Sequence, residues 1–182
     1  MKDLFTGDLT LRGVYREMGA DDPARIDELE RLTGYTLPPD YREFLLHFAP
    51  STFVRSICYR PLESRGREPY QIPEVFFGFN KGDMYDVIGN FQSTSGMYPA
   101  NMIPFSFDPG ANKILIALDE PAGRIYYQDK FTGKLYLCAL SLRDFFARCM
   151  LDPEYENLDD GEDEVFGEND LPPFKPGESH RQ

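Results

Sequence analysis

Apolar residues recur at helical spacing in the first of two predicted helices. The pattern predicts a helix over residues 22–32, with Asp22 as its N-cap and Pro23 in its first turn. The residues of its apolar stripe are Ile26, Leu29 and Leu32. Gly34 follows, and glycine accepts without a steric clash the left-handed conformation that ends many helices. We therefore expect this helix to pack one face against a core.

A second amphipathic helix is predicted directly after Pro38 and Pro39. Proline disfavours helix in the residue before it but fits the first turn of a helix, so the helix is expected to begin at this pair. Four apolar residues then fall at positions i, i+3, i+4 and i+7: Tyr41, Phe44, Leu45 and Phe48. Pro50 ends the helix.

Further along the chain, short apolar segments separated by turn residues predict strands. The predicted strands are residues 52–59, 74–79, 102–107, 113–118, 123–128 and 134–140. Residues 59–73 are polar, basic and bounded by proline, and are expected to form a loop. For residues 86–91 the pattern fits both the start of a helix and a short strand.

A final helix is predicted after Ser141, which can act as its N-cap together with Asp144 three residues later. Its buried face is expected to comprise Leu142, Phe145, Phe146, Cys149 and Met150. Consecutive strands joined by short turns pair antiparallel. We therefore expect a single α+β domain over residues 1–151, with a mostly antiparallel sheet of about five or six strands backed by helices.

Charge divides the chain at residue 152. Of the net charge of −12, most arises from residues 152–182, which contain 11 acidic and 2 basic residues, whereas residues 1–151 contain 20 and 17. This acidic, proline-containing segment is expected to be a flexible tail. Nucleic acids and anionic membrane surfaces require clustered lysine and arginine, so we expect direct binding to neither. A protein partner with a basic surface is the natural complement.

Cysteine usage and hydropathy indicate a reducing compartment. Cys58, Cys138 and Cys149 are widely spaced and odd in number, so the sequence predicts buried thiols and no disulfide framework. No apolar run approaches the roughly 20 residues that span a bilayer. Residues 1–19 lack the apolar region of a signal peptide. We therefore expect a cytoplasmic protein.

Four short segments carry motifs that follow one another in the order of a known family. They are residues 26–45, 104–108 (Pro-Phe-Ser-Phe-Asp), 123–126 (Gly-Arg-Ile-Tyr) and 141–145 (Ser-Leu-Arg-Asp-Phe). In this order the chain resembles the SUKH superfamily, which includes yeast cell-wall-assembly regulators and many bacterial immunity proteins of polymorphic toxin systems. The resemblance covers roughly residues 22–150. It departs from the family at residues 49–51 (Ala-Pro-Ser), where many members have Asn-Gly-Gly.

The resemblance implies an immunity protein that binds a cognate bacterial toxin and occludes its active site or substrate groove. Two other classes stay open. One is a non-catalytic regulatory scaffold that binds signalling proteins, as the cell-wall-regulator branch suggests. The other is a hydrolase built on aspartate or glutamate residues that converge in the fold.

The residue pattern itself favours binding over catalysis. The two histidines are isolated, His47 in the second predicted helix and His180 near the C-terminus. The sequence contains neither the spacing of a metal site nor a phosphate-binding glycine loop. The carboxylates of residues 159–164 lack the alternating register of a calcium loop. We therefore expect no catalytic residue, no cofactor and no bound metal.

The candidate partner-binding residues are acidic, and the expected partner is a toxin domain with a basic surface. Four lie in predicted turns, where interaction residues are common: Asp83, Asp86, Asp119 and Glu120. Five belong to the acidic tail: Asp159, Asp160, Glu162, Asp163 and Glu164. A further set is expected to have a structural role, because packing already explains its spacing: Leu37, Pro38, Tyr41, Phe44 and Leu45.

Overall fold

The computed structural model describes residues 1–14, 23–64, 66 and 69–154. Its helices in chain order are η1 (Lys2–Leu4), η2 (Gly7–Leu9), α1 (Pro23–Thr33), α2 (Pro39–His47), α3 (Val87–Ser93) and α4 (Leu142–Ala147), of which η1 and η2 are short 3-10 helices. Helices α1 and α2 confirm the two that the apolar spacing predicted. Asp22, the predicted N-cap of α1, lies outside the described residues.

The segment that the sequence pattern left open, residues 86–91, belongs to helix α3. Asp86 is its N-cap, and the Asp86 carboxylate accepts a hydrogen bond from the backbone N–H of Gly89 at 2.9 Å. An N-cap of this kind satisfies one of the free N–H groups in the first turn of a helix. The local capping bond therefore selects helix over strand.

Four consecutive strands form the antiparallel meander that the sequence predicted. They are β4 (Met102–Phe107), β5 (Lys113–Ala117), β6 (Ile125–Gln128) and β7 (Leu135–Ala139), hydrogen-bonded in this order. Side chains alternate between the two faces of a strand. Ile114 accordingly lies opposite Tyr127 in the main core, while Leu115 lies opposite Tyr126 on the other face of the sheet.

Two further strand pairs join distant parts of the chain. β1 (Leu11–Gly13) pairs antiparallel with β2 (Ser51–Phe53), and β3 (Ile57–Tyr59) pairs antiparallel with β8 (Cys149–Leu151). The prediction of one continuous β-like segment over residues 52–59 is therefore wrong, because this segment contains two separate strands. The chain bends at residues 54 and 55, and the two halves take different partners.

Residues 74–79 were predicted as a strand but form only isolated bridges. Phe76 bridges to Ser51 of β2 on one side and to Ser106 of β4 on the other, and so connects the β1–β2 pair to the central meander. Gly78 forms a parallel bridge to Asp86 and packs against the backbone at Ala49 and Pro50, so closely that a Cβ atom would not fit. The segment therefore joins its neighbours through single bridges and not through a continuous strand.

Helix α4 is shorter than the sequence pattern predicted. Its N-terminus is as expected, because the Ser141 hydroxyl accepts a hydrogen bond from the backbone N–H of Asp144 at 3.0 Å. The helix ends at Ala147, and Cys149–Leu151 form strand β8 instead of a further helical turn. Met150 is 43% exposed, so its predicted place on a buried helix face was wrong. Pairing with β3 imposes a period of two, which turns this side chain outward.

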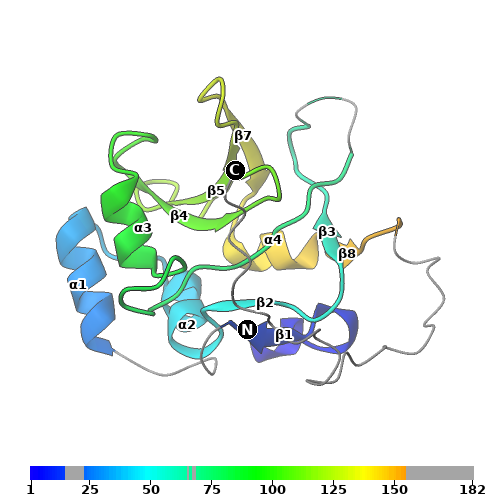
Figure 1. Ribbon diagram of the computed structural model, residues 1–182, viewed down its shortest axis with the longest axis horizontal. Coiled ribbons are helices and arrows are strands. Elements are labelled where there is room, and N and C mark those ends of the chain that lie inside the picture. Colours follow the sequence, from blue (N-terminus) through cyan, green and yellow to red (C-terminus); the bar gives the residue numbers. More distant parts are fainter. Residues whose placement is uncertain (15–22, 65, 67–68, 155–182) are drawn as a thin grey trace, which may run out of the picture.

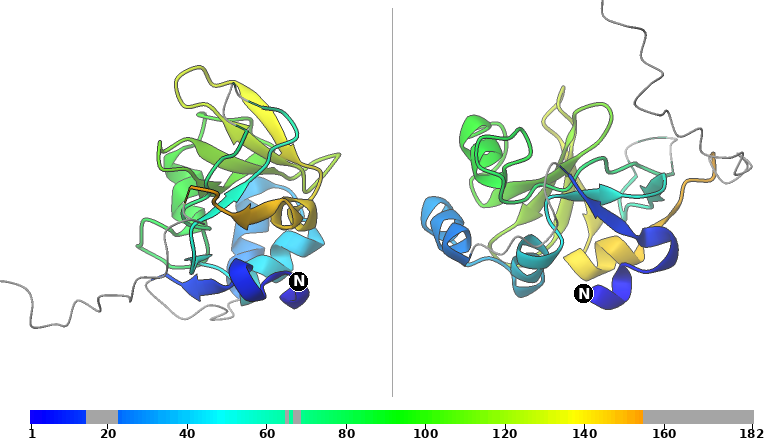
Figure 2. Two further views of the ribbon diagram at one scale, coloured as in Figure 1. Left: turned by 90° about the vertical axis from the view of Figure 1, so that its right-hand side faces the viewer. Right: turned by 60° about the horizontal axis from the view of Figure 1, so that its bottom comes forward.

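The helices cover the two faces of the meander unequally (Figures 1 and 2). α2 and α4 lie on one face over an aromatic core, in which the ring centroid of Phe105 is 5.6 Å from that of Phe44 and 5.1 Å from that of Phe76. α3 contacts β4, and the residues that follow it contribute to a smaller cluster with Tyr98 and Leu115 on the other face. The result is the single α+β domain that the sequence predicted.

The predicted boundary between domain and tail falls at the end of the described chain. Asp152, assigned to the tail, is buried, and its backbone N–H donates to the carbonyl oxygen of Ser56 at 3.1 Å. The first tail residue therefore packs against the domain. The flexible tail remains a prediction, because residues 155–182 lie outside the described part of the chain.

Candidate interaction surface

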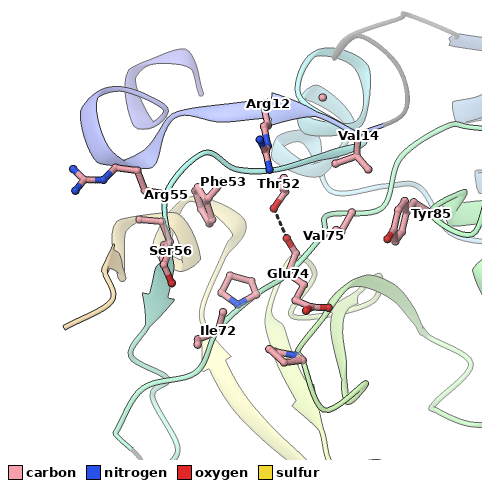
Figure 3. Close-up of a pocket in the computed structure, with 14 residues that line it drawn as sticks. Arg12, Val14, Thr52, Phe53, Arg55, Ser56, Ile72, Glu74, Val75 and Tyr85 are labelled. Carbon is pink, nitrogen blue, oxygen red and sulfur yellow. Dashed lines mark hydrogen bonds between the residues drawn. The ribbon is translucent and has the colours of Figure 1, made fainter. Parts of the chain in front are cut away.

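A groove of about 680 Å³ separates the β1–β2 pair from the extended residues 72–75 (Figure 3). Val75 and Tyr85 line this groove, and so does Pro109 of the β4–β5 turn. Most of its side chains are apolar: Val14, Phe53, Ile57, Ile72, Pro73, Val75, Tyr85 and Pro109. An apolar groove with a few polar groups is a common form of binding site.

Hydrogen bonds join the two walls of the groove and fix their relative position. The Thr52 hydroxyl donates to the carbonyl oxygen of Glu74 at 2.6 Å (Figure 3). Ser51, which precedes Thr52, exchanges two backbone hydrogen bonds with Phe76, of 2.8 and 3.2 Å. A surface that is already formed loses less conformational entropy on binding than one that must fold.

Two arginines and one glutamate supply the charge of the groove. Arg12 projects toward the groove, whereas Arg55 points out of it (Figure 3). The Arg55 guanidinium pairs with Asp8 at 2.7 Å, and both side chains are about half exposed, so this pair adds little stability. Arg12 forms no ion pair within the described part of the chain. The groove therefore offers one guanidinium with no ion pair to a described residue, beside a lining of apolar and polar side chains.

A second pocket, of about 360 Å³, lies beyond the β4–β5 turn, where Met97, Lys113 and Lys130 are among its lining residues. The Lys113 ammonium lies 5.7 Å from the ring centroid of Phe107. The Lys130 ammonium lies 5.0 Å from the ring centroid of Phe131. Neither lysine forms an ion pair with a described carboxylate. Burial lowers the pKa of Lys113. We refer to Met97, Lys113, Lys130 and Phe131 as the lysine surface.

The turn that carries Lys130 and Phe131 is braced by hydrogen bonds. The Asp129 carboxylate accepts from the backbone N–H of Phe131 at 3.0 Å and from that of Thr132 at 2.9 Å. The amide oxygen of Asn112 accepts from the backbone N–H of Lys130 at 3.0 Å, which ties this turn to the β4–β5 turn. Phe131 is nevertheless 82% exposed. A large aromatic side chain on a rigid turn is a typical anchor for a binding partner.

The four predicted acidic residues that the structure describes line neither of these two pockets. Asp83 and Asp119 are partly exposed and Glu120 is exposed, each in a turn. Asp83 accepts from the backbone N–H of Tyr85 at 2.8 Å, and Asp119 accepts from the side-chain amide of Asn101 at 2.7 Å. The predicted tail residues lie outside the described residues: Asp159, Asp160, Glu162, Asp163 and Glu164.

Asp86 occupies a different environment from the other predicted acids. It is 4% exposed, and its carboxylate pairs with Arg25 at 2.7 Å. The same carboxylate accepts hydrogen bonds from the backbone N–H groups of Asn80 and Gly89. These contacts account for Asp86 within the fold, because every interaction is internal and a partner has little access to the side chain.

The motif residues expected to be structural are all buried: Leu37, Pro38, Tyr41, Phe44 and Leu45. A further motif residue, Asp108, has a role that the sequence reasoning missed. One oxygen of its carboxylate accepts from the hydroxyl of Tyr127 at 2.9 Å, and the other accepts from the backbone N–H of Asn112 at 2.8 Å. Asp108 thereby fixes the turn between the two pockets. Its place at the end of a conspicuous motif was the signal available in the sequence.

The groove residues were also missed, and the sequence carried no signal for them. Arg12, Thr52, Val75 and Pro109 come from four separate segments, which the β1–β2 pairing and the Phe76 bridges bring together. Most of the lining is ordinary apolar sequence.

The three cysteines and His47, which were considered for chemistry, line neither of these two pockets. The three cysteines are free and buried, as expected, and burial raises the pKa of the Cys58 thiol to about 11. His47 is exposed at the end of α2, and His180 lies outside the described residues. Within the described ranges, no three metal-ligating side chains gather at one place. None of the helices there is both long and apolar enough to span a membrane.

Comparison with known proteins identifies similar sequences for most of the chain. The family model of the SMI1 / KNR4 family (SUKH-1) matches residues 22–148. The chain is also 27% identical over 159 residues to the SPbeta prophage-derived uncharacterized protein YokK of Bacillus subtilis (strain 168), an alignment that covers 75% of this chain and 79% of that protein. The family match extends from the N-terminus of α1 through α4.

Proposed function

The chain belongs to the SMI1 / KNR4 family (SUKH-1), and on this basis we propose that it is an immunity-type protein that neutralises a cognate bacterial toxin by binding it. The observation that carries the proposal is the family match over residues 22–148, which spans helices α1 to α4 and the central meander. The chain is also similar over 75% of its length to a prophage-derived protein.

The mechanism we propose is occlusion without catalysis, in the cytoplasm. The immunity protein covers the active site or substrate groove of the toxin with a surface that is already formed before the encounter. The groove lined by Arg12 and Val75 is one such surface, and the braced turn with Phe131 is another. Apolar and aromatic anchors on rigid elements slow dissociation, because little order has to be gained on binding.

Acidic residues would steer the encounter with a basic toxin domain. Among the described residues, Asp83, Asp119 and Glu120 can serve this role, and the acidic tail would add to it: Asp159, Asp160, Glu162, Asp163 and Glu164. Complementary charge of this kind raises the association rate and makes the rate depend on salt.

Co-expression with the toxin domain of a neighbouring gene tests the proposal. We expect the full chain to restore growth and to co-purify with the toxin domain. Absence of both growth rescue and binding would contradict the proposed function. A neighbourhood without any toxin gene, together with capture of a signalling protein, would support the regulatory scaffold instead.

A pair of matched variants tests whether the groove is the contact surface. Ile72→Lys places a positive charge in the groove, where it would repel a basic toxin surface, and Leu140→Lys makes a matched change at an exposed position outside the groove. We expect Ile72→Lys to weaken toxin binding at least tenfold and Leu140→Lys to leave it within twofold. If both variants bound the toxin with equal affinity, the contact surface would lie outside the groove, and the proposed immunity function would not be affected.

A further inference from the structure

The lysine surface is a cluster of ammonium groups around a pocket that Asp129 also lines. The ammonium groups of Lys113 and Lys130 contact aromatic rings but form no ion pair with a described carboxylate. Lys134, at the end of the same turn, adds a third ammonium group, which lies over the ring of Tyr136 at 4.6 Å. Five other cationic groups, by contrast, are paired: those of Arg25, Arg42, Arg55, Arg143 and Arg148. The surface is thus suited to an anionic ligand.

The same chain contains a segment of complementary composition. Residues 155–170 include eight acidic residues and no lysine or arginine. Apolar residues are interspersed among these acids: Tyr155, Leu158, Val165 and Phe166. The lysine surface offers exposed apolar partners as well, since Met97 is 67% and Phe131 82% exposed. The acidic segment and the lysine surface therefore carry opposite charges, and both contain exposed or interspersed apolar side chains.

The described chain ends beside a route to this surface. Asp152 donates its backbone N–H to Ser56, which lines one part of the groove. Tyr85 lines another part, and its ring centroid lies 6.2 Å from that of Phe107. The Lys113 ammonium is 5.7 Å from the centroid of the same Phe107 ring. Contacts through Tyr85 and Phe107 therefore connect the groove, which begins beside the end of the described chain, with Lys113 of the lysine surface.

Chain length does not limit this connection. Ten residues beyond Glu154 can span at most about 35 Å, whereas a domain of about 150 residues has a radius of gyration of about 15 Å. The first acidic run, residues 159–164, falls within those ten residues. A tethered ligand also has an effective concentration in the millimolar range, so individually weak ion pairs are sufficient for binding.

We propose that the acidic segment of residues 155–170 binds the lysine surface of the same chain. The interaction is intramolecular and electrostatic, with the aromatic and aliphatic side chains of both components in contact. It does not depend on the immunity function. One consequence is competition: a basic partner surface binds the acidic segment in place of the lysines, and an acidic partner surface binds the lysines in place of the segment.

Paramagnetic NMR on the full chain tests the proposal. Asn169→Cys introduces a labelling site without changing the charge, and the three native thiols are buried, so a nitroxide can be attached selectively. At an ionic strength of about 0.02 M we expect the amide signals of residues 111–113 and 128–134 to lose at least half of their intensity. At about 0.5 M the intensity should recover, because the Debye length falls to a few ångströms.

Charge-matched variants separate a specific surface from general attraction. Lys113→Gln with Lys130→Gln should restore most of the lost intensity, whereas Lys2→Gln with Arg31→Gln, which removes the same charge elsewhere, should not. Lys113 is partly buried, so Lys130→Gln with Lys134→Gln provides a second test on exposed positions only. Unchanged broadening in both lysine variants, or broadening that is the same at both ionic strengths, would overturn the proposal. A mixture in which the observed chains carry no nitroxide and a second set of chains does gives a further control. If the observed chains lose as much intensity as in the intramolecular experiment, the contact is between molecules and the proposal is overturned.

Discussion

Replacing Asp86 by alanine is expected to destabilise the protein by about 3 kcal/mol, because one buried carboxylate joins three elements of the fold. One oxygen accepts from Arg25 of α1 at 2.7 Å and from the backbone N–H of Asn80 at 3.1 Å. The other caps α3 through the backbone N–H of Gly89 at 2.9 Å. The substitution removes all three contacts.

The magnitude follows from the separate contributions. Loss of an N-cap costs about 1 kcal/mol. Removing one partner of a fully buried ion pair costs about 3–5 kcal/mol. Arg25 retains 13% exposure of its side chain and a second partner, Glu28 at 2.8 Å, so this contribution is reduced to about 2 kcal/mol. Asp86→Asn keeps a capping oxygen and loses only the charge, and is therefore expected to cost about 2 kcal/mol.

Urea unfolding of wild type, Asp86→Ala, Asp86→Asn, Arg25→Ala and the double variant with Arg25→Ala and Asp86→Ala measures these contributions. The exposed Glu120→Ala serves as a control and is expected to stay within about 0.5 kcal/mol of wild type. The two single alanine variants should be less than additive, because both remove the same ion pair. Additive effects, or an Asp86→Ala variant as stable as the control, would refute the structural role. If such a stable variant lost partner binding, the sequence-based hypothesis for Asp86 would be correct instead.

Three further predictions concern the Tyr41 hydroxyl, the Asp144 carboxylate and the cysteine thiols. Tyr41→Phe should leave stability unchanged or raise it by up to about 1 kcal/mol in urea unfolding, because the Tyr41 hydroxyl is buried with no hydrogen-bond partner among the described residues; a clear loss would show that the hydroxyl has a partner. Burial alone would raise the pKa of Asp144, but a backbone N–H and the Arg148 guanidinium outweigh it and lower that pKa. The stability advantage of wild type over Asp144→Asn should thus be fully present above about pH 4, the range of an unfolded aspartate, and disappear as the pH falls through the lower folded-state pKa. An advantage that persisted in full at pH 2 would contradict this assignment. Burial also raises the pKa of Cys58 to about 11 and that of Cys138 to about 12, so native protein should not react with a thiol-specific disulfide reagent at pH 8, whereas denatured protein should show three thiols; one fast-reacting thiol in the native state would disprove it.

Local periodicity in the sequence determined most of the helices and the central meander. The spacing of Tyr41, Phe44 and Leu45 allows one buried face on a helix, and the structure places all three in the core. Ser141 likewise marked the start of α4, because capping involves only residues three apart. The end of α4 could not be predicted in this way, since β8 forms by pairing with β3, more than 90 residues earlier.

The candidate surfaces depended entirely on such distant pairing. Hydrophobic periodicity indicates that a residue is buried but not which residue it meets, so neither the Phe76 bridges nor the groove beside them could be predicted. The same reason explains Asp86, whose turn sequence suggested exposure until Arg25 supplied a buried partner. The amino-acid sequence therefore determined the class of fold and the distribution of charge along the chain. Only the tertiary structure decided which charges are neutralised and which stay available, because an ion pair or a groove requires segments from different parts of the sequence to meet.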